Sequence, residues 1–261
     1  MMTIMLNSLL WLVLPLLSFY AVAESKPKLI FCYQDSPLSP YYLGSGAQTP
    51  SPPGASIEHL RRLTKKAGLQ LELLRRPWGR CLAELKTNKI HAVIGRYTPE
   101  RASFSRFPEK DGQPDPRRAF AEHASCLVAR KTRDWSWDGK QIISNHNLVL
   151  ARPNGFVPLN VSASAAVVQQ VMIDGTLDHA MLLQKRIDAA TTLCRVAGFS
   201  INTQMMDQLQ LEVLWPPVTV STSYLIFSNS FYKQNQKFAD QVWRELQQDK
   251  GLDIYQRILE Q

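Results

Sequence analysis

The chain has 261 residues, 45% of them hydrophobic, and a formal net charge of +8. This length suits one large domain or two modest lobes, and the basic balance favours nucleic acid, an anionic surface or an anionic ligand as the partner. Nucleic acid is disfavoured because the sequence contains no block of like charges and no aromatic-basic module.

The first 23 residues carry no charged side chain and have the features of a signal peptide. Residues 9–17 form an apolar run that contains Pro15, and Ala21-Val22-Ala23 is an A-x-A cleavage signal. The alternative is a membrane anchor, but the run is shorter than the ~20 apolar residues that a span needs. We therefore expect residues 1–23 to be removed and the protein to be exported to the periplasm.

Strands and helices alternate in the structure predicted for residues 28–94. Short apolar runs predict strands at residues 28–33, 69–74 and 91–94. Helical spacing of apolar residues predicts one helix at residues 57–67 and another directly after Pro77. This βαβαβ order implies a parallel sheet with right-handed crossovers.

Two arginines follow the strand at residues 91–94. Arg96 and Arg101 lie on either side of Thr98, at the carboxyl end of a strand, where open α/β sheets bind their ligands. A guanidinium can hold a carboxylate through two parallel hydrogen bonds. These residues predict an anion-binding site, and the alternative for Arg101 is an ion pair with Glu100 or another nearby carboxylate.

A second alternation of strands and helices is expected after residue 125, so we predict a second α/β lobe. The expected strands are at residues 125–131, 147–151, 187–193, 209–214 and 222–227, and Trp215-Pro216-Pro217 separates the last two. The expected helices run from Ser162 or Ser164 to Ile173, over residues 177–185, through Phe238 to Leu246, and from Leu252 onwards. Residues 109–118 are charged and proline-rich, which is typical of a surface loop.

Three motifs follow one another between Pro77 and Pro108. Residues 77–85 have the pattern P-W-x-R-x-L-x-x-L, residues 98–102 have the pattern T-x-E-R-A, and F-P follows at residues 107–108. In this order and spacing they resemble the family-3 extracellular solute-binding proteins. These are the type II periplasmic binding proteins, typified by the amino-acid receptors of ABC transporters.

The resemblance implies both the fold and the division of the chain. It implies an α/β fold of two lobes, each a mainly parallel sheet flanked by helices, joined by a two-strand hinge. Lobe 1 would comprise residues 24–125 and 222–261, and lobe 2 would comprise residues 126–221. A monomer that binds a small molecule is expected, with no cofactor, no metal and no nucleic acid.

The resemblance also implies roles for single residues. In the family, the arginine of T-x-E-R binds the ligand carboxylate, and Arg101 stands at that position. The loop after the first strand supplies part of the family's ligand pocket, so Asp35, Tyr41 and Tyr42 are candidates, although either tyrosine could simply pack the loop. The remaining candidates are Trp78 as an apolar wall, Thr98 beside Arg101, and Gly155 and Thr192 in the second lobe.

Two departures from the family pattern concern the charge of the ligand. Members that bind amino acids place an acidic residue shortly after the strand that corresponds to residues 187–193, where it neutralises the ligand's ammonium group. Residues 191–195 contain no carboxylate, and Arg96 stands where those members commonly carry a small hydroxyl residue. A buried ammonium without a counter-charge is costly. We therefore expect an anionic ligand rather than an ordinary α-amino acid.

Four cysteines, an even count in an oxidising compartment, permit two disulfides. Three pairings are open to Cys32, Cys81, Cys126 and Cys194. The coarse architecture favours Cys32 with Cys81 and Cys126 with Cys194, each pair inside one lobe, and buried free thiols are the alternative.

The sequence contains no hydrolase, metalloprotease, P-loop or dinucleotide-binding motif. The predicted function is capture of a small carboxylate-bearing solute between the lobes, without catalysis, for an ABC-type importer. Two alternatives use the same fold. One is a periplasmic lyase or dehydratase of small carboxylic acids with Asp35 as its acid or base, and the other is a sensor that presents its ligand to a membrane receptor.

Overall fold

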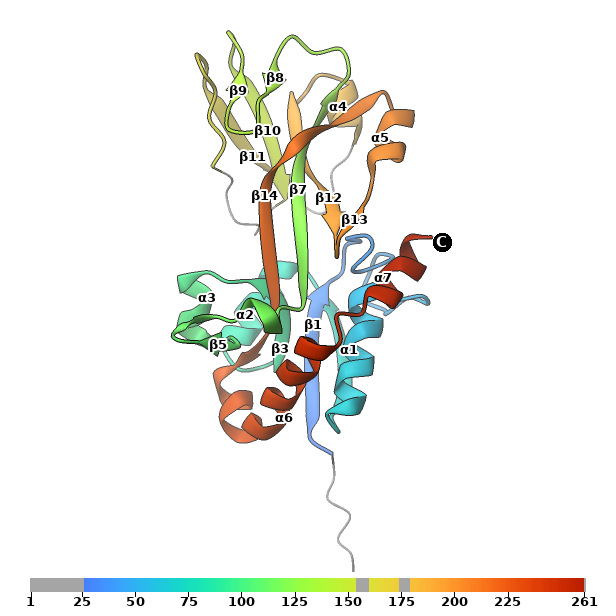
Figure 1. The fold of residues 1–261 in the computed structure, drawn as a ribbon, viewed down its shortest axis with the longest axis vertical. Helices are drawn as coiled ribbons and strands as arrows, with labels where there is room; N and C mark the ends of the chain where they lie inside the picture. Colours follow the sequence, from blue (N-terminus) through green and yellow to red (C-terminus); the bar gives the residue numbers. More distant parts are fainter. Residues whose placement is uncertain (1–25, 154–159, 174–178, 261) are drawn as a thin grey trace, which may run out of the picture.

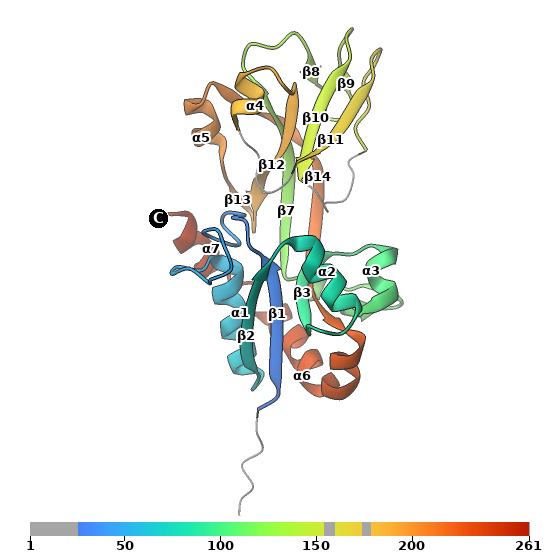
Figure 2. The ribbon, with the colours of Figure 1, turned by 180° about the vertical axis from the view of Figure 1, so that it is seen from behind.

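The computed structural model describes residues 26–153, 160–173 and 179–260 of the protein. Two lobes lie one above the other, and two long strands pass between them (Figure 1; Figure 2). The predicted signal peptide, residues 1–23, lies outside the described residues. Within these ranges, no helix combines the length and the apolar composition that a membrane crossing requires.

The first lobe contains the predicted alternation of strands and helices. Its elements are β1 (Lys28–Gln34), α1 (Ala55–Lys66), β2 (Gln70–Arg76), α2 (Trp78–Lys86), β3 (Ala92–Arg96), α6 (Asn229–Gln248) and α7 (Leu252–Leu259). Strand β1 lies between β2 and β3 and pairs in parallel with both. The predicted βαβαβ unit is therefore confirmed.

Side chains that alternate along β1 enter two different cores. Leu29, Phe31 and Tyr33 lie in the core that α1, α6 and α7 share, whereas Ile30 and Cys32 lie in the core that contains α2. Successive side chains of a strand point to opposite faces, so the sheet is covered on both sides. A strand buried on both faces is apolar at nearly every position, which explains the continuous apolar run.

The two strands that pass between the lobes are antiparallel to each other. They are β7 (Ala121–Arg130) and β14 (Leu211–Ser228), and the far end of β14 pairs with β3. The sequence predicts a break at Trp215-Pro216-Pro217, and this prediction is wrong. Proline has no N–H to donate, so pairing with β7 is skipped between Leu214 and Thr219, but the chain stays extended and β14 continues.

The second lobe extends the same sheet. Strand β10 (Leu148–Pro153) pairs in parallel with β11 (Val168–Ile173) and β12 (Ala189–Val196), and β12 pairs antiparallel with β7. Two short helices, α4 (His179–Leu183) and α5 (Thr203–Gln208), lie in this lobe. The sheet order is β11-β10-β12-β7-β14-β3-β1-β2, so one sheet runs through both lobes.

One predicted helix of the second lobe is wrong. The segment expected to be helical up to Ile173 forms strand β11 instead, with Val168 opposite Leu148 and Val171 opposite Ala151. β-branched residues favour strands where a partner strand is available, and β10 provides that partner.

The remaining elements are short. They are α3 (Pro99–Phe104), β4 (Ser105–Arg106), β5 (Glu109–Lys110), β6 (Gln113–Pro114), a 3-10 helix (Pro116–Arg118), β8 (Ser136–Trp137), β9 (Ile142–Ile143) and β13 (Phe199–Ser200). The predicted surface loop at residues 109–118 thus contains a small hairpin, β5 with β6.

Both predicted disulfides are present. Cys32 in β1 is bonded to Cys81 in α2, and Cys126 in β7 is bonded to Cys194 in β12. All four cysteines are fully buried. Each disulfide therefore crosslinks segments that are already packed against each other.

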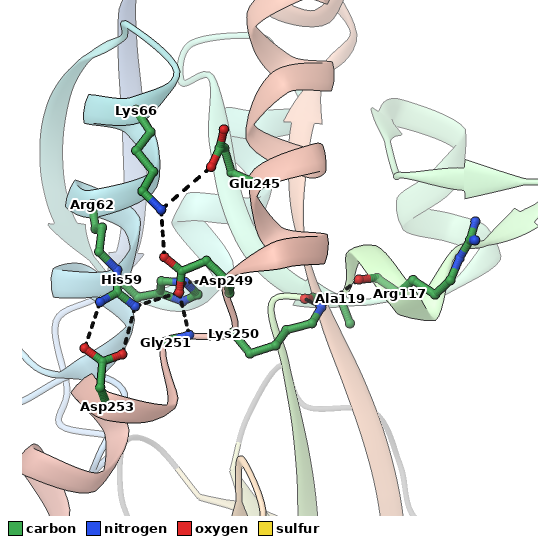
Figure 3. A network of polar contacts seen from close by, with 10 residues as sticks. All are labelled: His59, Arg62, Lys66, Arg117, Ala119, Glu245, Asp249, Lys250, Gly251 and Asp253. Atoms are coloured by element: carbon green, nitrogen blue, oxygen red, sulfur yellow. Dashed lines mark hydrogen bonds and ion pairs between the residues drawn. The ribbon is translucent and has the colours of Figure 1, made fainter.

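A network of charged groups holds the C-terminal helices against α1 (Figure 3). Asp249, which follows α6, accepts hydrogen bonds from Arg62 (2.6 Å) and Lys66 (3.1 Å) of α1 and from the backbone N–H of Gly251 (3.0 Å). Arg62 also donates to Asp253 of α7 at 2.8 Å. The return of the chain to the first lobe is therefore fixed by ion pairs as well as by apolar packing.

Candidate functional site

A cavity of about 140 Å³ lies where the two lobes meet. The first lobe lines it with residues from β1, β3, the loop after β1, and helices α1, α2 and α3: Gln34, Leu38, Tyr41, Tyr42, Ser56, Trp78, Ile94, Gly95, Arg96 and Arg101. The second lobe and the two crossing strands contribute His123, Ser125, Arg152, Thr191, Leu193, Thr219 and Ser223.

Arg75 fixes the loop that carries Tyr41 and Tyr42. Its buried guanidinium donates hydrogen bonds to the backbone carbonyls of Gly44 (2.6 Å) and Gln48 (3.1 Å). A buried arginine needs partners for its donors, and here loop carbonyls supply them. The polar loop after β1 thereby becomes a fixed wall of the cavity.

Gly54 lets the same loop close against α1. Its φ is 106°, a conformation that glycine adopts without steric cost, and a Cβ atom there would lie 2.9 Å from the Cα of Tyr42. Tyr41 and Tyr42 are each only 7% exposed. Both rings are therefore held at the cavity by the backbone of their own loop.

Arg101 is oriented by the start of α3. The Thr98 hydroxyl accepts a hydrogen bond from the backbone N–H of Arg101 (3.1 Å), so Thr98 caps this helix. The Arg101 Nη1 donates to the carbonyl of Arg96 (3.0 Å), and its guanidinium lies 5.6 Å from the centre of the Trp78 ring. Thr98, which was predicted as a ligand-binding residue, does not line the cavity. Its hydroxyl instead helps to position Arg101 through the hydrogen bond from the Arg101 N–H.

Arginines are the residues that carry a permanent charge in the described lining of the cavity. Three arginines line it and, among the described residues, no aspartate or glutamate does. Burial lowers the pKa of Arg101, and the charge of Arg96 lowers it further; burial also lowers the pKa of Arg96. The ordinary pKa of a guanidinium lies far above neutral pH, so both arginines stay cationic at pH 7.

Among the described residues, no carboxylate is in direct contact with either first-lobe arginine. Neither Arg96 nor Arg101 forms an ion pair with a carboxylate in the described parts of the chain, so the pairing of Arg101 with Glu100 does not occur. The charge of Glu100 raises the pKa of Arg101 but is the smallest of the three effects on it, so the two neighbouring guanidiniums still favour the binding of an anion.

Two buried polar atoms beside the cavity also find no hydrogen-bond partner among the described residues. Within residues 26–153, 160–173 and 179–260, neither the Tyr41 hydroxyl nor Nδ1 of His123 has a hydrogen-bond partner. Burial lowers the pKa of His123 to about 4, and the charge of Arg96 acts in the same direction, so the imidazole is neutral at pH 7. His123 was not predicted from the sequence, because the only signal for this residue is its position near the expected hinge.

Arg152 is one of the second-lobe lining residues that were not predicted from the sequence. It lies at the carboxyl end of β10, and this signal is the same one that pointed to Arg96. Thr191 and Leu193 line the cavity, but the predicted Thr192 does not, because side chains alternate along β12. The Thr192 hydroxyl accepts a hydrogen bond from Asn202 (3.4 Å) instead, and the predicted Gly155 lies outside the described residues.

Asp35 is also absent from the cavity lining. Its backbone N–H donates to the carbonyl of Arg76 (3.2 Å), and its own carbonyl accepts from the N–H of Gly46 (2.8 Å). These contacts give Asp35 a place in the loop rather than in the cavity wall. Elsewhere in the described ranges, no group of three or more His, Cys, Asp or Glu is arranged to hold a metal ion.

No protein-family model matches the sequence, and a search of curated proteins finds no match. Solved structures do match. An arginine 3rd transport system periplasmic binding protein from Legionella pneumophila is 13% identical, with a TM-score of 0.64 over 89% of this chain and 99% of that chain.

Two further structures match over 89% of this chain. The GluR0 ligand-binding core from Nostoc punctiforme, in complex with L-glutamate, is 14% identical with a TM-score of 0.58 and is covered completely, at 100%. The ancestral amino acid-binding protein AncCDT-1, a precursor of cyclohexadienyl dehydratase, is 13% identical with a TM-score of 0.58 and is covered over 95%. These likenesses confirm the predicted fold, the two-lobe α/β fold of type II periplasmic binding proteins.

Proposed function

We propose that this protein is an exported solute-binding protein that holds a small organic anion between its two lobes. The observation that carries this proposal is the charge of the cavity, with three arginines and no carboxylate among its described lining residues. The volume of about 140 Å³ suits a small organic acid. An engineered cavity of about 150 Å³ in another protein takes up a molecule the size of benzene.

Arg101 is the proposed anchor for a carboxylate. Its backbone is capped by Thr98, and its guanidinium is fixed by the carbonyl of Arg96 and by the Trp78 ring. A donor group that is already held in place loses little entropy when the ligand binds. Tyr41 and Trp78 would form apolar walls beside it.

Export and delivery to a membrane partner complete the proposal. The predicted signal peptide and the two disulfides support an oxidising compartment such as the periplasm. We assign lobe 1 to residues 24–125 and 222–261, with β7 and β14 as the hinge, and an ABC-type importer as the partner. Capture of importer subunits from detergent-solubilised membranes by the ligand-loaded protein would support the importer, whereas capture of a receptor would assign the sensor role.

The test of ligand charge is a thermal-shift screen with amino acids, polyamines, monocarboxylates and dicarboxylates. A ligand raises the melting temperature according to the ratio of its concentration to its dissociation constant. We expect shifts with carboxylates and not with polyamines. Replacing Arg101→Gln should weaken carboxylate binding by ~2–5 kcal/mol, because a buried charge loses its partner.

The matched control is Arg80→Gln. The Arg80 side chain is 62% exposed on α2 and pairs with Glu84, so this variant loses the same charge outside the cavity. Carboxylate binding should be almost unchanged in it. A melting-temperature shift that occurs with polyamines alone and survives Arg101→Gln would refute an anionic ligand.

The second candidate function is a lyase of small carboxylic acids, and His123 is the observation that favours it. A neutral imidazole beside a bound acid, with no partner for its Nδ1 in the part of the chain that the structure describes, could act as a base. Incubation with the carboxylates that bind, followed by NMR of the mixture, would reveal any product. Turnover that His123→Gln abolishes would replace the binding proposal with this one.

A further inference from the structure

Apolar and aromatic side chains from both lobes line the cavity. The first lobe supplies Leu38, Tyr41, Tyr42, Trp78 and Ile94, and the second lobe supplies Leu193. Leu38, Ile94 and Leu193 are only partly buried, and they pack against the core that contains Tyr41 and Tyr42. An apolar group bound among these side chains would remove their surface from water, which is favourable.

Several polar side chains of the lining already have hydrogen-bond partners inside the protein. The hydroxyl of Ser56 shares a hydrogen bond with that of Tyr255 (3.3 Å). The hydroxyl of Ser223 donates to the carbonyl of Ala121 (3.1 Å), and Nε2 of Gln34 donates to a backbone carbonyl of the loop after β1 (3.0 Å). Because these groups are paired, a hydroxyl on the ligand would gain little from them.

Gly95 keeps the space beside Arg101 open. It is buried in β3, where it pairs with Tyr224 of β14. A Cβ atom at this position would lie 3.5 Å from Nη1 of Arg101 and 3.7 Å from the Trp78 ring. These are ordinary van der Waals distances, so the strand can accept a methyl group there. That methyl would nevertheless occupy space that the guanidinium and the ring both border, and the carbon atoms next to a bound carboxylate would need this space.

We propose that the ligand is a small monocarboxylate with a branched or aromatic apolar body, whose carboxylate binds Arg101 and whose body lies over Gly95 beside the Trp78 ring. This inference rests on the proposed function and narrows its ligand class to acids without hydroxyl groups. The volume of about 140 Å³ suits a body no larger than a benzene ring. Gly95 then sets how large the body can be next to the carboxylate.

The experiment compares isobutyrate with lactate by isothermal titration calorimetry. The two acids have nearly the same shape, with a methyl group in isobutyrate where lactate has a hydroxyl. We expect isobutyrate to bind roughly 10-fold or more tightly, since an apolar pocket favours the methyl over the hydroxyl. Benzoate should bind more tightly still, because it buries more apolar surface. Benzamide has the same shape as benzoate without its charge and should bind weakly.

The first variant tests the space beside Arg101. Gly95→Ala should weaken benzoate binding roughly 10-fold or more, because the added methyl takes space that the ring needs. Gly79→Ala is the matched control, since Gly79 is exposed on α2 directly after Trp78 and lies outside the described cavity lining. Benzoate binding should be almost unchanged in it.

The second variant tests the apolar wall. Leu193→Asn replaces an apolar side chain of the second lobe by a polar one of similar size, so it should reduce the advantage of isobutyrate over lactate. Leu183→Asn is its control, because Leu183 is 46% exposed on α4 and lies outside the described lining. The advantage of isobutyrate should stay the same in this control.

The outcomes separate this inference from the proposed function. Lactate that binds as tightly as isobutyrate, or more tightly, would overturn the apolar body while anion binding stands, and this comparison needs no variant. Unchanged benzoate binding in Gly95→Ala would also overturn the inference. If no carboxylate binds, or if benzamide binds as tightly as benzoate, the proposed function fails as well. A melting curve of each unliganded variant shows whether a loss of binding reflects a loss of folding.

Discussion

Removal of the Tyr41 hydroxyl should stabilise the unliganded protein. This hydroxyl is buried without a hydrogen-bond partner in the described part of the chain. A buried, unpaired polar group costs ~1–3 kcal/mol of stability. Tyr41→Phe keeps the ring and its edge-on contacts with Tyr255 and His123, so the free energy of unfolding should rise by about 1 kcal/mol. For a chain of this size that gain raises the melting temperature by ~2–4 °C.

Tyr33→Phe is the matched control, with the opposite sign. Tyr33 belongs to the same core as Tyr41, but its hydroxyl forms a hydrogen bond with Thr49 at 2.8 Å. Its removal should cost about 1 kcal/mol. Urea unfolding of both variants at pH 7, without ligand, measures the two changes. A loss of stability in Tyr41→Phe would refute the reasoning, because it would mean that an ordered water already pairs with the hydroxyl.

Three further predictions concern stability. Thiol titration of the denatured, unreduced protein should find almost no free cysteine, and four reactive thiols would contradict the pairing. Reduction of each disulfide should lower the free energy of unfolding by ~4 kcal/mol, from the loop-closure entropy for separations of 49 and 68 residues. Burial lowers the pKa of both His59 and His123 to about 4. Between pH ~6.5 and pH 4 the unfolded chain therefore binds more protons at these two histidines than the folded chain does. The free energy of unfolding is thus highest above pH ~6.5 and falls towards pH 4, by ~3 kcal/mol for each histidine. Urea unfolding between pH 4 and pH 7 measures this fall in stability, and His123→Gln should make the fall smaller. If the free energy of unfolding does not change with pH in either protein, burial does not lower the pKa of these histidines. Gly251→Ala should destabilise the protein by ~2 kcal/mol or more, because φ at this position is 67° and a Cβ would lie 2.8 Å from the His59 ring. The control is Gly198→Ala, where φ is 89° and no atom is close, so this variant should lose only the stability that the backbone conformation costs. Equal losses of stability in the two variants on thermal unfolding would exclude the contact with His59 as the cause.

Local signals were sufficient for the first lobe. Apolar runs and helical spacing predicted β1, β2 and β3 with α1 between the first two strands, because each element there is fixed by a short, continuous segment. The T-x-E-R motif indicated Arg101 for the same reason, since Thr98 caps the helix that orients it. The cysteine pairs followed from the same coarse order of elements.

Pairing between distant segments decided the structure of two regions that were predicted incorrectly from the sequence. Residues expected to be helical up to Ile173 form a strand because β10 offers a partner, and β14 continues past its prolines because β7 lies alongside it. A strand's hydrogen bonds reach another part of the chain, so no local pattern contains them.

The sequence by itself predicted a two-lobe α/β fold, favoured two disulfide pairs and indicated Arg101 as a candidate anion-binding residue, because short segments carry those signals. The tertiary structure alone brought His123 and Arg152 to the same cavity as Arg101, across a lobe junction. It also selected Thr191 over Thr192, because the register of β12 against β7 decides which face of the strand meets the cavity. Which side chains share a cavity depends on register and on contacts between lobes, and both are properties of the folded chain.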